Sequence, residues 1–80
     1  GDAVQIVDFK TNRPPPADPE SVPFLYRRQM AVYREVLRQI YPDWDVRCAL
    51  LWTHGPRLMA LSEESLDEAI AAVRARDLAP

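Results

Sequence analysis

Residues 4–9 read VQIVDF, a short apolar run rich in β-branched side chains. Apolar residues fall on both alternating sets of positions, which is typical of a strand covered on both faces of its sheet. We therefore expect a buried strand in which Phe9 points into the core. Asp8 and Lys10 are two residues apart at its end, so both side chains should leave the same face.

Residues 12–23 form a connection dominated by proline. The stretch 11–23 reads TNRPPPADPESVP and holds five of the eight prolines of the chain. Because proline lacks the backbone N–H that a helix interior or a central strand uses, neither element is expected here. The composition predicts an extended, stiff segment instead.

A helical pattern covers residues 22–41. Apolar side chains recur there at steps of three and four residues, so that they form one stripe along a helix. The stripe consists of Tyr26, Met30, Tyr33, Leu37 and either Ile40 or Tyr41. Pro42 ends the pattern, because its ring cannot continue a helix.

The rest of the chain predicts two strands and a second helix. Residues 46–53 (VRCALLWT) are strongly apolar, and residues 57–61 follow a short turn, as in a hairpin. Ser62 is placed to cap the next helix, with Leu61 and Leu66 spaced as a hydrophobic staple across that cap. The order β-α-β-β-α, with a crossover joining two parallel strands, predicts an α/β fold with a mixed sheet.

Length and composition narrow the class of protein. The chain has 80 residues, a net charge of −2 and one cysteine. We expect residues 1–80 to form a single partial domain from a longer protein, located in the cytoplasm, where an unpaired cysteine stays reduced. One cysteine excludes an internal disulfide or a Cys-based zinc finger, and no apolar run approaches the ~20 residues of a membrane span. Cys48, within an apolar strand, is expected to act as a small buried hydrophobe.

Asp8 and Lys10 are the first residues that could carry chemistry. Lys10 is the single lysine of a chain that otherwise uses arginine, so a compact ammonium occupies this position. A carboxylate can hold a hard divalent cation, and an ammonium beside it can stabilise the charge that develops during phosphodiester cleavage. The alternative is a solvated ion pair at the end of a strand.

Three motifs together resemble a known family. VDFKT, the proline-rich connection and the Q-x-x-x-Y spacing of Gln29 and Tyr33 resemble the nuclease domain of the RecB family, within the PD-(D/E)XK superfamily. More narrowly, IVDFKTNRPPP, YRRQMAVY and RCALLWTHGPRL are similar to the C-terminal part of that domain in alphaproteobacterial helicase–nucleases of the AddAB type. The resemblance covers nearly all of residues 4–70. A core location on the apolar stripe is the alternative for Tyr33.

The resemblance implies a truncated restriction-endonuclease-like layer and a DNA nuclease that uses Mg²⁺, or Mn²⁺ in its place. Asp8 would bind the metal, Lys10 would orient the attacking water, and Gln29 and Tyr33 would line the site and position the strand to be cut. ATP would be used by a helicase part outside this chain, which unwinds broken duplex ends into single strands. The partner would be a second helicase–nuclease subunit of AddB type.

The chain departs from the family pattern in one respect. The first metal-binding aspartate of the family lies in a strand upstream of D-x-K, which we expect to lie outside this chain. Asp2 is a poor substitute for it, because Gly1-Asp2 is expected to be the turn that leads into the first strand. We therefore expect this piece to be inactive by itself. Without the neighbouring strands, the edge of the first strand would be exposed and would let the piece self-associate.

Four arginines are candidates for contact with DNA phosphates. Arg13 follows Lys10 in the connection, and Arg27, Arg34 and Arg38 lie along the first helix. The alternative for the helix arginines is an ordinary solvated face. A non-catalytic DNA- or protein-binding scaffold with the same fold is the alternative to an enzyme.

Overall fold

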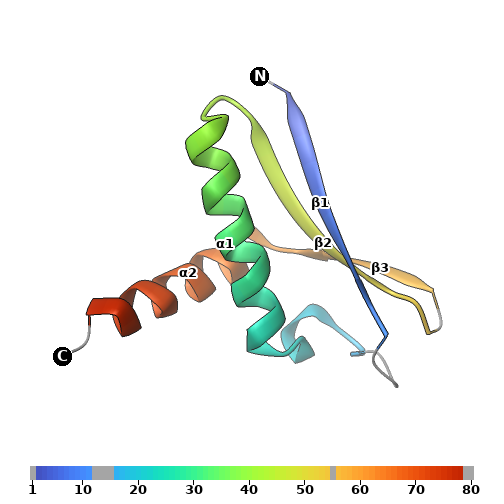
Figure 1. The fold of residues 1–80 in the computed structure, drawn as a ribbon. Helices are drawn as coiled ribbons and strands as arrows, with labels where there is room; N and C mark the ends of the chain where they lie inside the picture. The colour runs from blue at the N-terminus through green and yellow to red at the C-terminus, as the bar shows by residue number, and fades with distance from the viewer. Residues whose placement is uncertain (1, 12–15, 55, 79–80) are drawn as a thin grey trace.

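The computed structural model describes residues 2–11, 16–54 and 56–78. Three strands, a short 3₁₀ turn and two helices follow one another along the chain (Figure 1). They are β1 (Ala3–Lys10), η1 (Pro19–Ser21), α1 (Phe24–Ile40), β2 (Asp45–Trp52), β3 (Arg57–Leu61) and α2 (Glu63–Leu78). The predicted α/β class is confirmed, and β3 has the predicted bounds.

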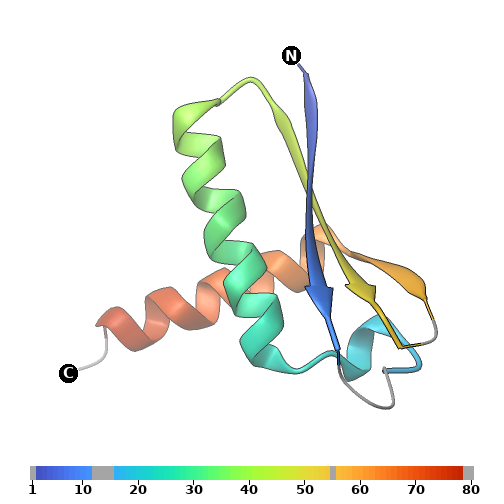
Figure 2. The ribbon, with the colours of Figure 1, turned by 45° about the vertical axis from the view of Figure 1, so that its right-hand side comes forward.

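The three strands form one mixed sheet in the order β1-β2-β3. β1 and β2 run parallel, joined by the crossover through α1, and β3 returns antiparallel to β2 (Figure 2). The register places Asp8 opposite Leu50 and Lys10 opposite Trp52. The end of β1 therefore lies beside the most deeply buried part of β2.

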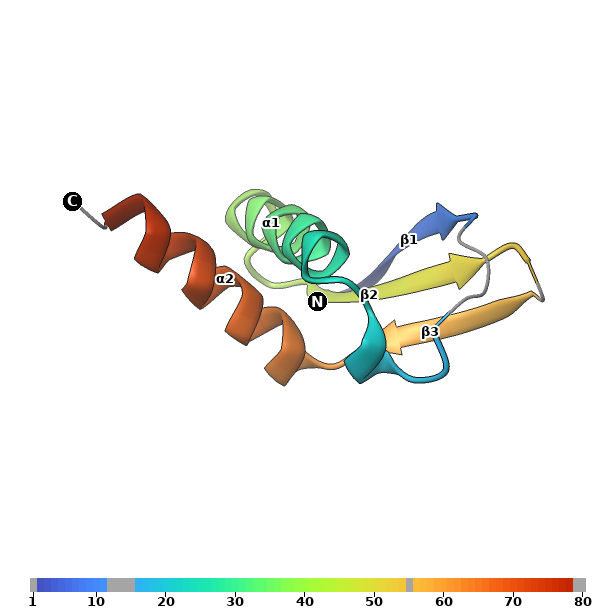
Figure 3. The ribbon, with the colours of Figure 1, turned by 90° about the horizontal axis from the view of Figure 1, so that it is seen from below.

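The helices cover one face of the sheet. α1 lies along this face against β2, and α2 crosses α1 and extends away from the strands (Figures 1 and 3). Every second residue of β2 points under α1 and is buried. The core joins these residues to both helices and to β3, through Met30, Ala31, Cys48, Leu50, Trp52, Met59, Leu61, Leu66 and Ala69.

The opposite face of the sheet is open. Phe9 is 66 % exposed, and Val7 and Leu58 are also exposed on this side. The expectation that β1 is buried on both faces, with Phe9 in the core, was therefore wrong. The described helices pack on one face alone, so the apolar side chains of β1 that point to the other face are exposed to solvent. β1 is also an edge strand of this sheet.

The proline-rich connection contains a turn that the composition did not predict. Asp18 caps η1, because its Oδ1 accepts hydrogen bonds from both the backbone N–H and the hydroxyl of Ser21, each at 3.0 Å. Pro19 is compatible with the first position of a helical turn, where its missing N–H would have no partner in any case. Val22 then enters the core at 3 % exposure. Residues 12–15, part of the expected extended segment, lie outside the described residues.

The start of α2 follows the predicted cap. The hydroxyl of Ser62 accepts a hydrogen bond from the backbone N–H of Ser65 at 3.1 Å. Leu61 and Leu66, on either side of the cap, are both buried, as the staple predicted. Among the described residues, no helix is long and apolar enough to cross a membrane.

Candidate functional site

The end of β1 presents a carboxylate and an ammonium on the covered face of the sheet. Lys10 Nζ lies 2.9 Å from Asp8 Oδ2, and the Lys10 side chain is only 14 % exposed. The backbone at this point is fixed, because the carbonyl of Lys10 accepts hydrogen bonds from the N–H and the hydroxyl of Thr53. The expected shared face of the two side chains is confirmed.

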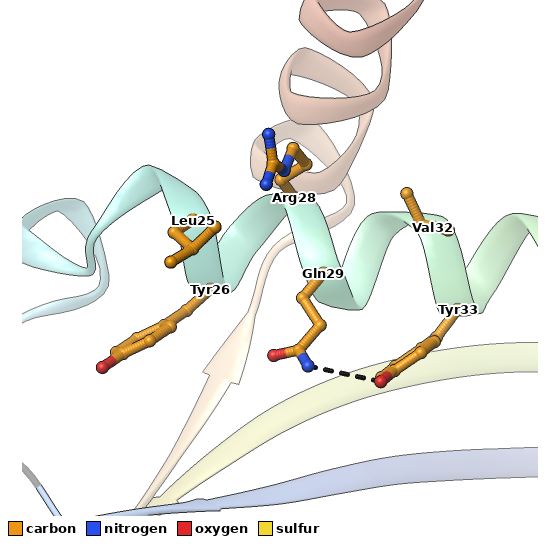
Figure 4. A pocket seen from close by; sticks show the side chains of 6 residues that line it. All are labelled: Leu25, Tyr26, Arg28, Gln29, Val32 and Tyr33. Carbon is orange, nitrogen blue, oxygen red and sulfur yellow. Dashed lines mark hydrogen bonds between the residues drawn. The ribbon is translucent and has the colours of Figure 1, made fainter.

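Two residues of α1 extend this pair. Lys10 Nζ donates to Gln29 Oε1 at 3.3 Å, and Gln29 Nε2 donates to the Tyr33 hydroxyl at 3.2 Å. Figure 4 shows both side chains leaving α1 on the side of the strands. The crossover therefore brings together Asp8, Lys10, Gln29 and Tyr33 in one chain of contacts. Tyr33 is 44 % exposed, so the alternative of a core tyrosine does not hold.

Tyr26 belongs to the same cluster, although its spacing had assigned it only to the apolar stripe. The ammonium of Lys10 lies 4.2 Å from the centre of the Tyr26 ring, within the range of a cation–π interaction. The Tyr26 ring in turn lies 6.2 Å from that of Trp52, which is fully buried. Its position three residues before Gln29, on the same side of the helix, was the signal that could have identified it.

A hollow opens beside these residues. It has a volume of about 370 Å³ and is lined by Leu25, Tyr26, Arg28, Gln29, Val32 and Tyr33 (Figure 4). An apolar groove of about 450 Å³ continues on the other side of Tyr33, between α1 and Ile6 of β1. The Tyr33 hydroxyl, which accepts from Gln29, therefore stands at an accessible place with its own proton left to donate.

The donor set at this site suits a divalent cation only weakly. Among the described residues, no three His, Cys, Asp or Glu side chains lie close enough together to hold a metal ion. Asp8 offers one carboxylate, and its Oδ2 is already paired with Lys10. Mg²⁺ commonly takes one or two protein carboxylates and completes its shell with water and substrate phosphates. Asp8 fits that use as one ligand and requires further oxygen ligands from elsewhere.

The arginines of α1 do not form one exposed stripe. Arg34 is fully buried, and its Nη2 lies 2.7 Å from Asp67 of α2 and 3.4 Å from Glu35. Because α2 packs across α1 at this point, the guanidinium ties the two helices together. Arg34 is therefore neither a solvated residue nor one that a phosphate can reach in this structure.

The other candidate arginines occupy different surroundings. Arg38 pairs with Glu35 at 3.6 Å. Arg27 lies against the ring of Phe24, at 5.5 Å, and lines a hollow together with three glutamates, Glu20, Glu64 and Glu68. Arg13 lies outside the described residues. The structure thus does not gather the three described arginines, Arg27, Arg34 and Arg38, into a single cationic surface.

Cys48 has a structural role. Its side chain is buried on β2, and its Sγ lies 3.7 Å from the backbone carbonyl of Met30 in α1. Burial raises the pKa of the thiol above its usual value, because the thiolate would lose its hydration. The expectation of a small buried hydrophobe is confirmed.

The chain was also compared with protein-family models, curated proteins and solved structures, and none of them matches it. A function for this chain is therefore inferred from the contacts around Lys10.

Proposed function

We propose that this chain supplies part of a Mg²⁺-dependent DNA nuclease site in an AddA-type helicase–nuclease that processes double-strand breaks for recombinational repair. In this proposal the substrate is a single strand released from an unwound duplex end. ATP is consumed by a helicase part outside the chain, and a subunit of AddB type is the partner. The reaction is hydrolysis of a phosphodiester bond in that strand.

The chain of contacts from Asp8 through Lys10 and Gln29 to Tyr33 carries this proposal. An ordinary exposed ion pair contributes little to stability. Holding its ammonium with further contacts would therefore gain little. Here one ammonium is held by a carboxylate, an amide oxygen and the face of the Tyr26 ring. A cation kept in place before the substrate arrives is what electrostatic stabilisation of a reaction requires.

The residues can divide the work of hydrolysis among them. When water attacks the phosphorus atom, negative charge builds on the phosphoryl oxygens, and in this proposal the Lys10 ammonium stabilises that charge. The Tyr33 hydroxyl can donate its proton to a phosphate oxygen, and Gln29 sets the orientation of that hydroxyl. Asp8 would hold Mg²⁺, which when bound would activate water and offset the developing charge. None of these groups reads a base, so we expect cutting without strong sequence preference.

The test is cleavage of single-stranded DNA by the full-length protein in Mg²⁺. We expect Asp8→Ala and Lys10→Ala each to reduce cleavage by about 10²-fold or more, as the loss of a catalytic electrostatic group does, while ATP-dependent unwinding persists. The chain offers a matched control in Asp45 and Arg47, a second Asp–cation pair that also meets at 2.9 Å. Asp45→Ala and Arg47→Ala should cut like the wild type.

Two outcomes would overturn the proposal. One is a wild-type protein that does not cut, and the other is a pair of Asp8 and Lys10 variants that cut normally. In either case the non-catalytic DNA- or protein-binding scaffold becomes the better account of the fold.

A further inference from the structure

A second groove lies where the outer side of α1 meets α2. It has a volume of about 470 Å³ and is lined by Arg28, Val32, Val73 and Arg76. Arg28 and Val32 also line the hollow beside Gln29 and Tyr33, so the two depressions adjoin across α1. In Figure 4, Arg28 leaves α1 on the side away from Gln29. A ligand that extends from one depression to the other would pass over the helix between them.

The groove differs in charge from the rest of the helical layer. Three other arginines of α1 and α2 are paired with acids, and Glu35 alone contacts Arg34, Arg38 and Arg74. Arg28 and Arg76 form no ion pair with any side chain that the structure describes, and no acidic residue lines their groove. Among the side chains that the structure describes, no carboxylate therefore offsets their positive charge.

The neighbouring residue Arg27 shows the contrast. The hollow that contains Arg27 is lined by Glu20, Glu64 and Glu68, which oppose its charge. A polyanion should be repelled by these carboxylates and attracted to the groove of Arg28 and Arg76. The apolar side chains of Val32 and Val73, between the two arginines, can contact sugars or bases without selecting a sequence.

We propose that Arg28 and Arg76 bind backbone phosphates of a single DNA strand that passes over α1 from the site at Lys10. This inference rests on the proposed function and names the path of its substrate. Guanidinium groups suit this role, because their planar set of N–H donors matches phosphate oxygens in two-point hydrogen bonds. The positive charge of the groove and the adjoining position of the two depressions favour a nucleic-acid strand over an acidic peptide. The peptide would have no phosphates with which to occupy both depressions.

The first test measures binding of a fluorescent oligothymidylate to the chain in EDTA, so that no cleavage can interfere. We expect Arg28→Gln and Arg76→Gln each to weaken binding about tenfold, as loss of a charge-assisted hydrogen bond does. Each should also lower the slope of log affinity against log salt by ~0.7, the value for one phosphate contact on a single strand. Two variants serve as controls. Arg74→Gln changes an arginine on the same helix as Arg76 that is paired with Glu35, and Arg47→Gln changes an arginine on the open face of the sheet.

A second measurement covers the case in which a variant chain does not fold. In the full-length protein, Arg28→Gln with Arg76→Gln should raise the KM for single-stranded DNA and leave kcat unchanged. Wild-type affinity, salt slope and KM in these variants would overturn the inference, as would tighter binding of polyglutamate than of oligothymidylate.

The outcomes separate this inference from the proposed function. If Asp8→Ala abolishes cutting while the arginine variants behave like the wild type, only the path of the strand is wrong. If the arginine variants lose binding and the wild type does not cut, the groove belongs to a non-catalytic DNA-binding domain.

Discussion

Two pairs of an aspartate and a cation occur at the same spacing on neighbouring strands. Asp8 and Lys10 lie two residues apart on β1, and Asp45 and Arg47 lie two apart on β2. The oxygen–nitrogen distance is 2.9 Å in both pairs. Their exposures differ: the Asp8 and Lys10 side chains are 31 % and 14 % exposed, whereas those of Asp45 and Arg47 are 47 % and 73 % exposed.

The face of the sheet accounts for the difference. Asp8 and Lys10 point to the face that α1 covers, where Gln29 and Tyr26 contact the ammonium. Asp45 and Arg47 are on the opposite face, which the described helices leave open. The same local pattern, an aspartate and a cation two residues apart, therefore occurs once on the covered face of the sheet and once on the open face. Only the pair beneath α1 is built into a network that could act on a substrate.

The largest effect should come from disturbing the covered face. Met30 of α1 is fully buried, and its carbonyl faces Cys48 of β2. We expect Met30→Ala to lower the free energy of unfolding by about 2–5 kcal/mol, through lost apolar contacts and the cavity left behind. Leu58→Ala, on the open face, should cost less than about 0.5 kcal/mol. Urea unfolding of the wild type and the two variants compares them, and equal losses would show that the open face is covered in solution, for example by a second copy.

A smaller effect is expected where α1 reaches the pair on β1. Gln29→Ala removes the amide that links Lys10 to Tyr33, so cleavage by the full-length protein should fall by about 10–100-fold, as when a residue that orients a catalytic group is lost. Gln39→Ala changes an exposed amide on the same helix and should have no effect. Equal cleavage by both variants would mean that the bridge between strand and helix has no part in the reaction.

The smallest effect should be the contribution of each ion pair to stability. Double-mutant cycles on the free energy of unfolding should give about 0.2–1 kcal/mol for Asp45 with Arg47, as for other exposed pairs. The value for Asp8 with Lys10 should be larger, since the less exposed ammonium is less screened by water. A coupling for the β1 pair equal to or below that of the β2 pair would show that the cover of α1 does not strengthen the ion pair beneath it.

Much of the local structure could be predicted from the sequence. The bounds of β3, the capping of α2 by Ser62 and the end of α1 before Pro42 follow from residues within a few positions of one another. The shared face of Asp8 and Lys10 follows from strand geometry alone. These features depend on backbone preferences and short-range hydrogen bonds, which residues close together in the sequence determine.

Other residues could not be placed in this way. Phe9 looked like a core residue, and Arg34 looked exposed, yet the structure shows the reverse. Tyr26 shares the apolar stripe of its helix, and its spacing from Gln29 places it on the right side of that helix but does not show that its ring contacts Lys10. In each case the outcome depends on which element packs against the residue, and that element lies far away in the sequence.

The sequence by itself determined the strands, the helices and the pairing of a carboxylate with a lysine at the end of β1. Only the tertiary structure decided that this pair, and not the similar pair on β2, meets an amide and a tyrosine ring from α1, with the hydroxyl of a second tyrosine bonded to that amide. The physical reason is that helical and strand periodicities fix the directions of side chains within an element. The sheet register and the crossing of the helices fix which of those directions meet.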